Sequence, residues 1–143
     1  LGRQSQQQVE ALMARCRAYV YAGLEDFGIA PVEAMASGAP VIALGRGGLL
    51  DTVRCASSGM PNATGVLFPD QTLESLQQAV QWFEEQRLWR QLDAELIRRW
   101  AERFGPEAFA ARFEAALHRA WAAHRQSCDV AASDPARVPG LLS

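Results

Sequence analysis

The sequence predicts an α/β fold in which helices flank a parallel sheet. Short apolar runs at residues 18–22, 40–44 and 65–70 alternate with stretches that carry apolar residues at helical spacing. The middle run is rich in branched residues and lacks alternation with polar ones, which is typical of a central parallel strand covered on both faces. The chain has 143 residues, 49% of them hydrophobic, so it is large enough for one compact domain with a sizeable core.

The first expected elements are a helix over residues 6–16 and a strand over residues 18–22. Apolar side chains recur in the helix at steps of three and four, so they form one stripe. The strand leads through a turn at Gly28 into a short helix at residues 31–37. Pro31 suits the first turn of that helix, because no amide hydrogen is needed there.

The middle of the chain continues the alternation of helices and strands. Gly38 closes the short helix as the left-handed residue beyond its end. The strand at residues 40–44 is followed by a tight turn at residues 45–48 and a helix over residues 49–54. Residues 57–64 contain glycine, proline and asparagine and are expected to form a loop before the third strand.

Three helices are expected in the last part of the chain. Thr72 is a suitable N-cap for the first of them, whose apolar residues recur at helical spacing as far as Phe83. A second helix covers residues 88–104, and the dipeptide Gly105-Pro106 breaks it. A long amphipathic helix then spans residues 107–125.

The turn at Gly28 has the properties of an anion-binding site. Backbone amides at a helix start are free to donate, and the helix dipole reinforces their attraction for negative charge. Gly28 has no side chain, so a ligand can approach the main chain closely. Phe27, Gly28 and Ile29 would supply the amides, and the sequence therefore predicts a site for a phosphorylated ligand. Taken alone, Gly28 is better interpreted as an ordinary turn glycine. Phe27 has the alternative role of a core aromatic, which is compatible with an amide that faces a ligand.

Two carboxylates flank this turn, Glu25 and Glu33. A carboxylate accepts hydrogen bonds only and has room for two hydroxyl donors, so it suits a vicinal diol such as ribose. The alternative is that each acid merely interacts favourably with the helix dipole, which is worth about 0.3 to 1 kcal/mol. Asp26, between them, has no assigned role.

The segment from Glu25 to Gly48 combines several motifs. Glu25 and Glu33 are separated by seven residues, and a glycine turn, a proline, a buried strand and a Gly-Gly pair accompany them. This combination resembles the retaining glycosyltransferases of the GT-B architecture, and most of all the bacterial group 1 enzymes that act on polysaccharide or lipid-linked acceptors. Mannosyltransferases are prominent among those enzymes. The resemblance implies a Rossmann-like sheet.

Site roles follow from the resemblance, residue by residue. It implies that Glu25 is the catalytic-site acid that lies beside the donor sugar and hydrogen-bonds its hydroxyls. The amides of Phe27, Gly28 and Ile29 would face the sugar and diphosphate, and Glu33 would accept hydrogen bonds from the nucleotide ribose. The donor would be a nucleotide-sugar, with GDP-mannose as one candidate. Transfer would keep the anomeric configuration and need no metal or other cofactor.

The resemblance also implies how the chain is organised. We expect residues 1–126 to be a partial C-terminal GT-B donor-binding domain, the truncated second half of the enzyme, and residues 127–143 to be a flexible C-terminal tail. Family members generally carry a lysine and an arginine upstream of this region, against the diphosphate, and neither has a counterpart here. With the N-terminal GT-B domain missing as well, we expect the fragment alone to bind donor weakly or not at all and to be inactive.

An aromatic stripe marks the last predicted helix. Phe109, Phe113, Leu117 and Trp121 follow one another in steps of four, and such stripes are usually core. In the GT-B family, however, the final helix commonly packs on the first domain. Without that domain, part of the stripe is expected to be exposed, or covered by a second copy in a homo-oligomer contact.

Composition excludes several other classes. The formal charge of −2 and the pI near 5.7 provide no field for holding a polyanion, so nucleic acid is not an expected partner. Cys16, Cys55 and Cys128 are odd in number and widely spread, which argues against a disulfide framework or a zinc site. We expect a cytoplasmic location, with the parent enzyme peripheral at the inner face of the cell membrane.

Three alternatives remain open at this point. A non-catalytic nucleotide-binding module would keep the turn for binding alone, and a purely structural α/β module would have no open site at Glu25 and Glu33. Within the enzyme interpretation, a sugar epimerase or phosphorylase of the same architecture is the third alternative.

The glycine-rich segment at residues 45–48 lacks the spacing of a dinucleotide fingerprint and is expected to be only a tight turn. Arg46 in that segment is an alternative contact for phosphate.

Overall fold

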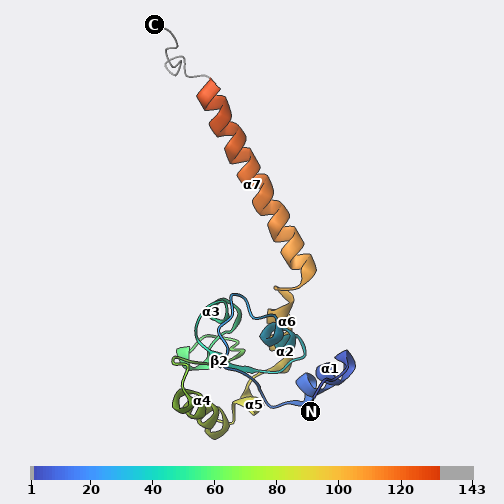
Figure 1. Cartoon of the computed structure of the whole chain (residues 1–143), viewed down its shortest axis with the longest axis vertical. Coiled ribbons are helices and arrows are strands. Elements are labelled where there is room, and N and C mark those ends of the chain that lie inside the picture. Colours follow the sequence, from blue (N-terminus) through green and yellow to red (C-terminus); the bar gives the residue numbers. More distant parts are fainter. Residues whose placement is uncertain (1, 133–143) are drawn as a thin grey trace. The chain divides into compact units, whose positions relative to one another are not determined.

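The computed structural model describes residues 2–132 and divides into two compact units, Leu1–Phe104 and Gly105–Ser143 (Figure 1). The first unit holds all the strands of the described chain and helices α1 to α6. The second unit is represented by the long helix α7, Pro106–Ala132. Each unit is described below by itself.

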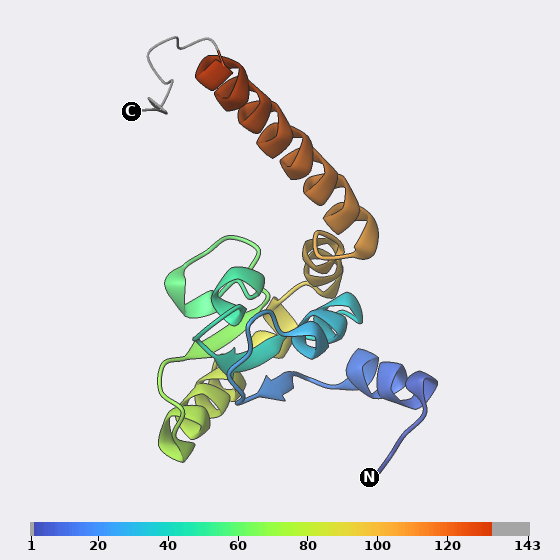
Figure 2. The same ribbon diagram turned by 45° about the horizontal axis from the view of Figure 1, so that its top comes forward.

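The sheet of the first unit has three parallel strands in the order β1-β2-β3 (Figure 2). They are β1 (Tyr19–Tyr21), β2 (Val41–Leu44) and β3 (Gly65–Phe68). In the register of the sheet, Tyr19 lies opposite Val41, and Val41 lies opposite Gly65. The predicted parallel α/β fold is therefore confirmed.

The central strand β2 is buried on both faces. Val41 and Ala43 point into one hydrophobic cluster, whereas Ile42 and Leu44 point into another, and all four are at most 1% exposed. Successive side chains of a strand alternate between faces. Because both faces are covered, the run reads as continuously apolar, as the sequence predicted.

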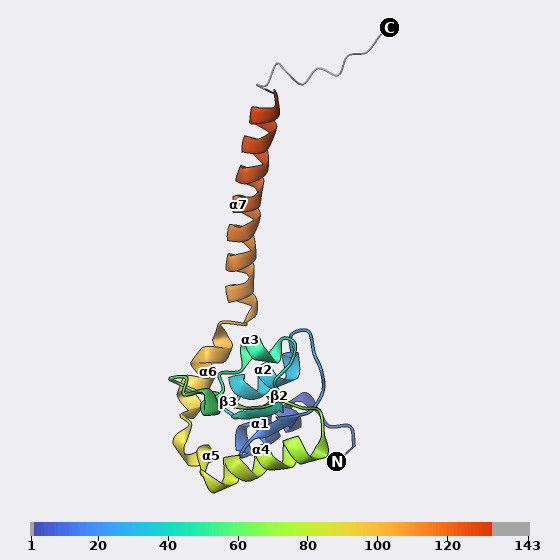
Figure 3. The same ribbon diagram turned by 90° about the vertical axis from the view of Figure 1, so that its left-hand side faces the viewer.

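Helices cover the two faces of the sheet (Figure 3). Helices α2 and α6 pack on the cluster that contains Val41, and α1 adds partly buried side chains to it. Helices α4 and α5 pack on the cluster that contains Ile42. The bounds are α1 (Gln6–Arg15), α2 (Ile29–Ala36), α3 (Leu49–Thr52), η1 (Ala56–Ser58), α4 (Leu73–Glu85), α5 (Leu88–Gln91) and α6 (Ala94–Glu102).

Polar caps fix where several helices begin. The Thr72 side chain accepts a hydrogen bond of 3.2 Å from the Ser75 amide at the start of α4, which confirms the predicted N-cap. Ser5 and Gln8 form a capping box at the start of α1. A cap of this kind satisfies an amide that the helix itself leaves unpaired.

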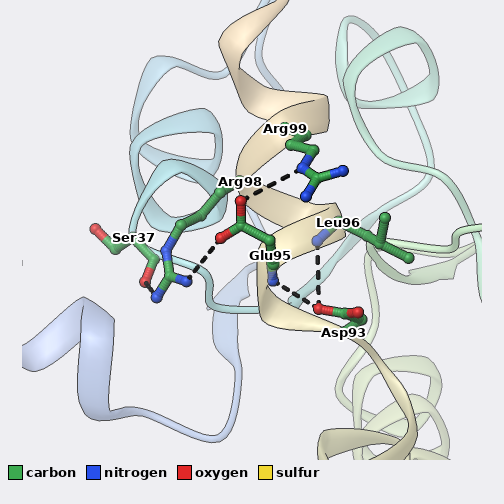
Figure 4. Close-up of polar contacts among 6 residues, drawn as sticks. All are labelled: Ser37, Asp93, Glu95, Leu96, Arg98 and Arg99. Atoms are coloured by element: carbon green, nitrogen blue, oxygen red, sulfur yellow. Dashed lines mark hydrogen bonds and ion pairs between the residues drawn. The ribbon is translucent and has the colours of Figure 1, made fainter.

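The single helix predicted over residues 88–104 is wrong, because the chain breaks into α5 and α6 at Asp93. The Asp93 side chain accepts bonds from the amides of Glu95 at 2.8 Å and Leu96 at 3.4 Å, so it starts a new helix (Figure 4). Asp is among the strongest N-caps, and this preference overrides the continuous apolar spacing.

Helix α6 also closes the end of α2 (Figure 4). The Arg98 guanidinium donates to the Ser37 carbonyl at 3.3 Å and lies 3.6 Å from the Glu95 carboxylate. Gly38 has a φ of +88°, and a Cβ at this position would lie 2.8 Å from the Arg98 guanidinium. The prediction that Gly38 is the left-handed residue after the helix is confirmed.

Helix α7 begins at Pro106, one residue before the expected start at residue 107, and it continues to Ala132 rather than ending at residue 125. The first six residues of the expected tail are therefore helical, and residues 133–143 lie outside the described part. Packing divides the described chain after Phe104, whereas the domain boundary expected after residue 126 stays a prediction. Over residues 2–132, no helix is long and apolar enough to cross a membrane.

The aromatic stripe of α7 is not core. Phe109, Phe113, Leu117 and Trp121 are between 56% and 64% exposed, so the core interpretation is wrong and the expectation of exposure holds. Within the stripe, the Phe109 and Phe113 rings stack with centroids 5.7 Å apart.

Candidate functional site

The predicted site residues lie where the parallel strands end. Carboxyl ends of parallel strands share one edge of a sheet, so the segments after β1, β2 and β3 meet there. The Gln71 side-chain amide, beyond β3, donates to the Ala22 carbonyl after β1 at 2.9 Å. Arg46, after β2, forms an ion pair of 3.3 Å with Asp70, after β3. Below, residues 23–28 are called the first turn and residues 45–48 the second turn.

Helix α2 begins with free backbone donors. Gly28 is its N-cap, with φ 85° and ψ 65°, and no side chain caps the helix. The amide of Val32 is the first to bond back to the Gly28 carbonyl, at 3.2 Å. In the described part of the chain, the amides of Phe27, Gly28 and Ile29 donate to no other protein group. They are therefore available to an anion, and the helix dipole favours one there.

Glycine is required at position 28 by the backbone conformation and by packing, in addition to the access that it gives a ligand to the main chain. Its φ of +85° is a left-handed conformation that other L-residues rarely adopt. A Cβ at Gly28 would lie 2.6 Å from Cδ2 of Leu49, a side chain that is fully buried. The first turn therefore packs directly on helix α3, and a substituted residue would have to move that contact.

The second turn supports the backbone of the first. The Gly48 amide donates to the Glu25 carbonyl at 2.9 Å. A Cβ on Gly48 would lie 2.1 Å from the Asp26 carbonyl oxygen, and one on Gly47 would lie 2.3 Å from the Glu25 carbonyl oxygen. The two main chains therefore approach each other at a distance that only glycine permits. The sequence indicated a tight turn here but not this crossing.

The Glu25 side chain is exposed and is held by a tyrosine that the sequence analysis did not single out. The Tyr21 hydroxyl donates a hydrogen bond to Oε1 of Glu25. This hydrogen bond raises the pKa of the Tyr21 phenol, because it favours the protonated form beside a carboxylate. Tyr21 lies across Gly23, where a Cβ would be 2.7 Å from the tyrosine hydroxyl.

Glu33 lies on the exposed face of α2, one turn after Ile29. Partial burial, and to a lesser extent the charge of Glu33, raise the pKa of the Tyr19 phenol. Tyr19 and Tyr21 are two residues apart on β1, so they point to the same face of the sheet. Both tyrosines pack against the cluster that α2 covers, and each is influenced by one of the two acids.

Phe27 has two environments. Its ring packs edge-on against Phe104, with centroids 5.8 Å apart at an interplanar angle of 71°, yet the side chain remains 43% exposed. The ring thus rests partly on the domain while the amide stays free. Ile29, at the start of α2, is 68% exposed, whereas Gly28 between them is buried, so the turn is exposed on either side of its central glycine.

A more hollow part of the surface lies elsewhere in the first unit. It is lined by Trp82, Gln86 and Leu92 among others, between the segment before β3 and helices α4 to α6. None of the predicted site residues lines it. Over the described residues, no group of three or more histidine, cysteine, aspartate or glutamate side chains is arranged to hold a metal ion. That metal is not needed stays a prediction.

Comparison with protein families identifies the chain. The family model described as "Glycosyl transferases group 1" matches residues 1–104, which include the whole candidate site. The chain belongs to the group 1 glycosyl transferases. Among solved structures, sucrose-phosphate synthase from Thermosynechococcus elongatus is similar, with a TM-score of 0.67 and 29% identity over 86% of this chain. A search of curated proteins found no match.

The comparisons confirm the predicted family at the level of group 1 glycosyl transferases and the α/β fold of a GT-B enzyme. The chain spans about 30% of the length of the sucrose-phosphate synthase. The preference for mannose, the retaining mechanism and the roles of individual residues stay predictions.

Proposed function

We propose that this group 1 glycosyl transferase chain is the donor-binding part of a retaining enzyme. The enzyme would move a sugar from a nucleotide-sugar to a polysaccharide or lipid-linked acceptor, with GDP-mannose as one candidate donor. The observation that carries the proposal is the first turn, where the start of α2 has unpaired amides, with the exposed Glu25 before them and the exposed Glu33 after them in the sequence.

The proposed roles follow the geometry. The amides of Phe27, Gly28 and Ile29 bind the diphosphate and the adjoining sugar, because they are unpaired donors at the positive end of α2. Glu33 accepts from the ribose hydroxyls and Glu25 from the sugar hydroxyls. The amides also stabilise the negative charge that develops on the leaving diphosphate, and preorganised donors of this kind are typically worth about 3 kcal/mol each.

The whole enzyme needs parts besides the first turn. An N-terminal GT-B domain would bring the acceptor, and the exposed stripe of α7 offers an apolar surface for that domain or for a second copy. We place the enzyme in the cytoplasm, with the whole protein at the inner face of the cell membrane. We expect no sugar transfer by this chain alone.

A second candidate is a nucleotide-binding module without catalysis. It would keep the unpaired amides of the first turn for binding a nucleotide alone. This candidate shares the binding site but predicts no transfer by any longer protein that contains the chain.

Calorimetry and a transfer assay together test the proposal. The chain is titrated with GDP, UDP and ADP, each with and without an attached mannose or glucose. We expect one nucleotide family to bind, and the matching sugar to be transferred only by the longer enzyme. Binding without transfer in that enzyme would support the non-catalytic module. No binding by either protein would contradict both candidates.

A further inference from the structure

We propose that Tyr21 is a positioning residue, which fixes the Glu25 carboxylate so that Oε2 is presented to a single hydroxyl of the donor sugar. The inference rests on the proposed function, because it assumes that Glu25 contacts that sugar. It adds a residue with no role in the proposal above, and it specifies which oxygen of Glu25 the donor meets.

The backbone of Glu25 is already held by the second turn. Its carbonyl accepts from the Gly48 amide at 2.9 Å, and Gly47 leaves no space between the two main chains. The remaining freedom of Glu25 is therefore in its side chain. An exposed glutamate with no partner samples many rotamers, and binding a ligand would have to restrict them.

Tyr21 supplies that restriction before the ligand arrives. Its ring packs against the hydrophobic cluster under α2, and its hydroxyl reaches Oε1 of Glu25 across Gly23. The ring is anchored on a strand, so the hydroxyl is a rigid donor. Within the described residues, Oε2 of Glu25 has no protein partner. One carboxylate oxygen is thus held by the protein, while the other is open to a hydroxyl donor.

The alternative arrangement is one in which both carboxylate oxygens of Glu25 accept hydrogen bonds from a vicinal diol of the sugar. If Tyr21 positions Glu25, removing its hydroxyl frees the carboxylate and weakens its bond to the sugar. If instead the diol needs both oxygens, Tyr21 competes with the donor, and removing its hydroxyl strengthens binding. The two possibilities therefore predict opposite changes in how much the sugar contributes to the affinity for the nucleotide-sugar.

The test measures the sugar increment, defined as the affinity for a nucleotide-sugar divided by the affinity for the same free nucleotide. Calorimetry on the whole chain compares wild type with Tyr21→Phe, which keeps the ring but removes the hydroxyl. We expect the increment to fall about fivefold, as for loss of one oriented hydrogen bond, while affinity for the free nucleotide is unchanged.

Two further variants and one donor-free measurement sharpen the test. Gly23→Ala keeps the hydroxyl but places a Cβ 2.7 Å from it, so we expect the same loss. Tyr19→Phe removes a hydroxyl from the same face of β1 and should leave the increment unchanged. An NMR titration of the Tyr21 ring should show a lower pKa in Glu25→Gln than in wild type, because the bond to the carboxylate is lost.

Each outcome bears on the inference. An unchanged or larger increment in Tyr21→Phe, with nucleotide binding retained, would overturn the role of Tyr21 and leave the proposed function intact. An unchanged Tyr21 pKa in Glu25→Gln would also overturn it. Failure of both the wild-type chain and the longer enzyme to bind any nucleotide or nucleotide-sugar would contradict the proposed function and this inference with it.

Discussion

The first and second turns lie against each other at the carboxyl edge of the sheet, both are rich in glycine, and each uses glycine differently. In the first turn, Gly28 adopts a left-handed conformation that starts α2 and leaves amides free. In the second turn, the Gly48 amide donates to the Glu25 carbonyl. Gly47 and Gly48 have no side chains, so the main chain of the first turn can lie directly against them. The first turn therefore has donors for a ligand, whereas the second serves as its support.

This comparison shows why glycine content alone does not identify a phosphate site. What separates the two turns is where each amide finds its acceptor, and that depends on contacts far apart in the sequence. The following substitutions test the distinction, in order of decreasing expected effect.

Gly48→Ala should destabilise the protein most. A Cβ at this position would lie 2.1 Å from the Asp26 carbonyl oxygen, and main-chain atoms cannot move aside as a side chain can. We expect the free energy of unfolding in urea to fall by about 3 kcal/mol. Gly59→Ala is the control, because Gly59 has a φ of +68° but nothing within 4 Å, and it should lose only about 1 kcal/mol. Similar losses in both variants would contradict the close crossing.

Gly28→Ala should reduce both stability and donor binding. The left-handed conformation alone costs about 1 to 2 kcal/mol for alanine, and relief of the contact with Leu49 would shift the free amides. We expect nucleotide affinity, measured by calorimetry, to fall about tenfold as well. Asp93→Ala is a matched control, since loss of that N-cap costs about 1 kcal/mol without changing a residue of the first turn. Equal binding by the two variants would show that the amides are not the site.

Glu33→Gln tests the ribose contact without disturbing the fold. The side chain is exposed, so stability should change by less than about 0.5 kcal/mol. Because a charge-assisted hydrogen bond is roughly twice as strong as a neutral one, we expect affinity for the nucleotide to fall about tenfold. Asp51→Asn removes an exposed acid from α3, after the second turn, and should leave affinity unchanged. An equal loss in that control would indicate a general charge effect.

Arg46→Gln should have the smallest effect. Its ion pair with Asp70 is 3.3 Å long between side chains that are 56% and 64% exposed, and such pairs contribute about 0 to 1 kcal/mol. If the second turn is only a support, nucleotide affinity should stay within about twofold of wild type. A tenfold loss in calorimetry would instead make Arg46 a phosphate contact and remove the distinction between the turns.

Local rules predicted much of this fold. The continuous apolar character of β2, the cap at Thr72 and the break at Gly105-Pro106 each follow from a few neighbouring residues, and the structure has them. The position of Gly28 at the start of α2 was accessible in the same way. These features depend on burial, capping and backbone conformation, which short segments encode directly.

Features that depend on competition or on distant contacts were missed. Asp93 divides a segment whose apolar spacing is continuous, because its capping bonds outweigh that pattern. The Phe109 stripe has the spacing of a core helix, but spacing does not reveal whether a partner is present to cover it. Tyr21 was assigned only to a strand. Its partner Glu25 lies in the irregular segment after β1, and side-chain directions in such a segment do not follow a regular spacing.

The central claim is that the first turn, and not the second, binds the diphosphate of the donor. Amide NMR of the chain titrated with GDP or UDP tests it most directly, because each amide reports on its own surroundings. We expect the resonances of Phe27, Gly28 and Ile29 to shift most, and those of residues 45–48 to shift only slightly. Saturable shifts centred on residues 45–48, with the amides of the first turn unchanged, would contradict it.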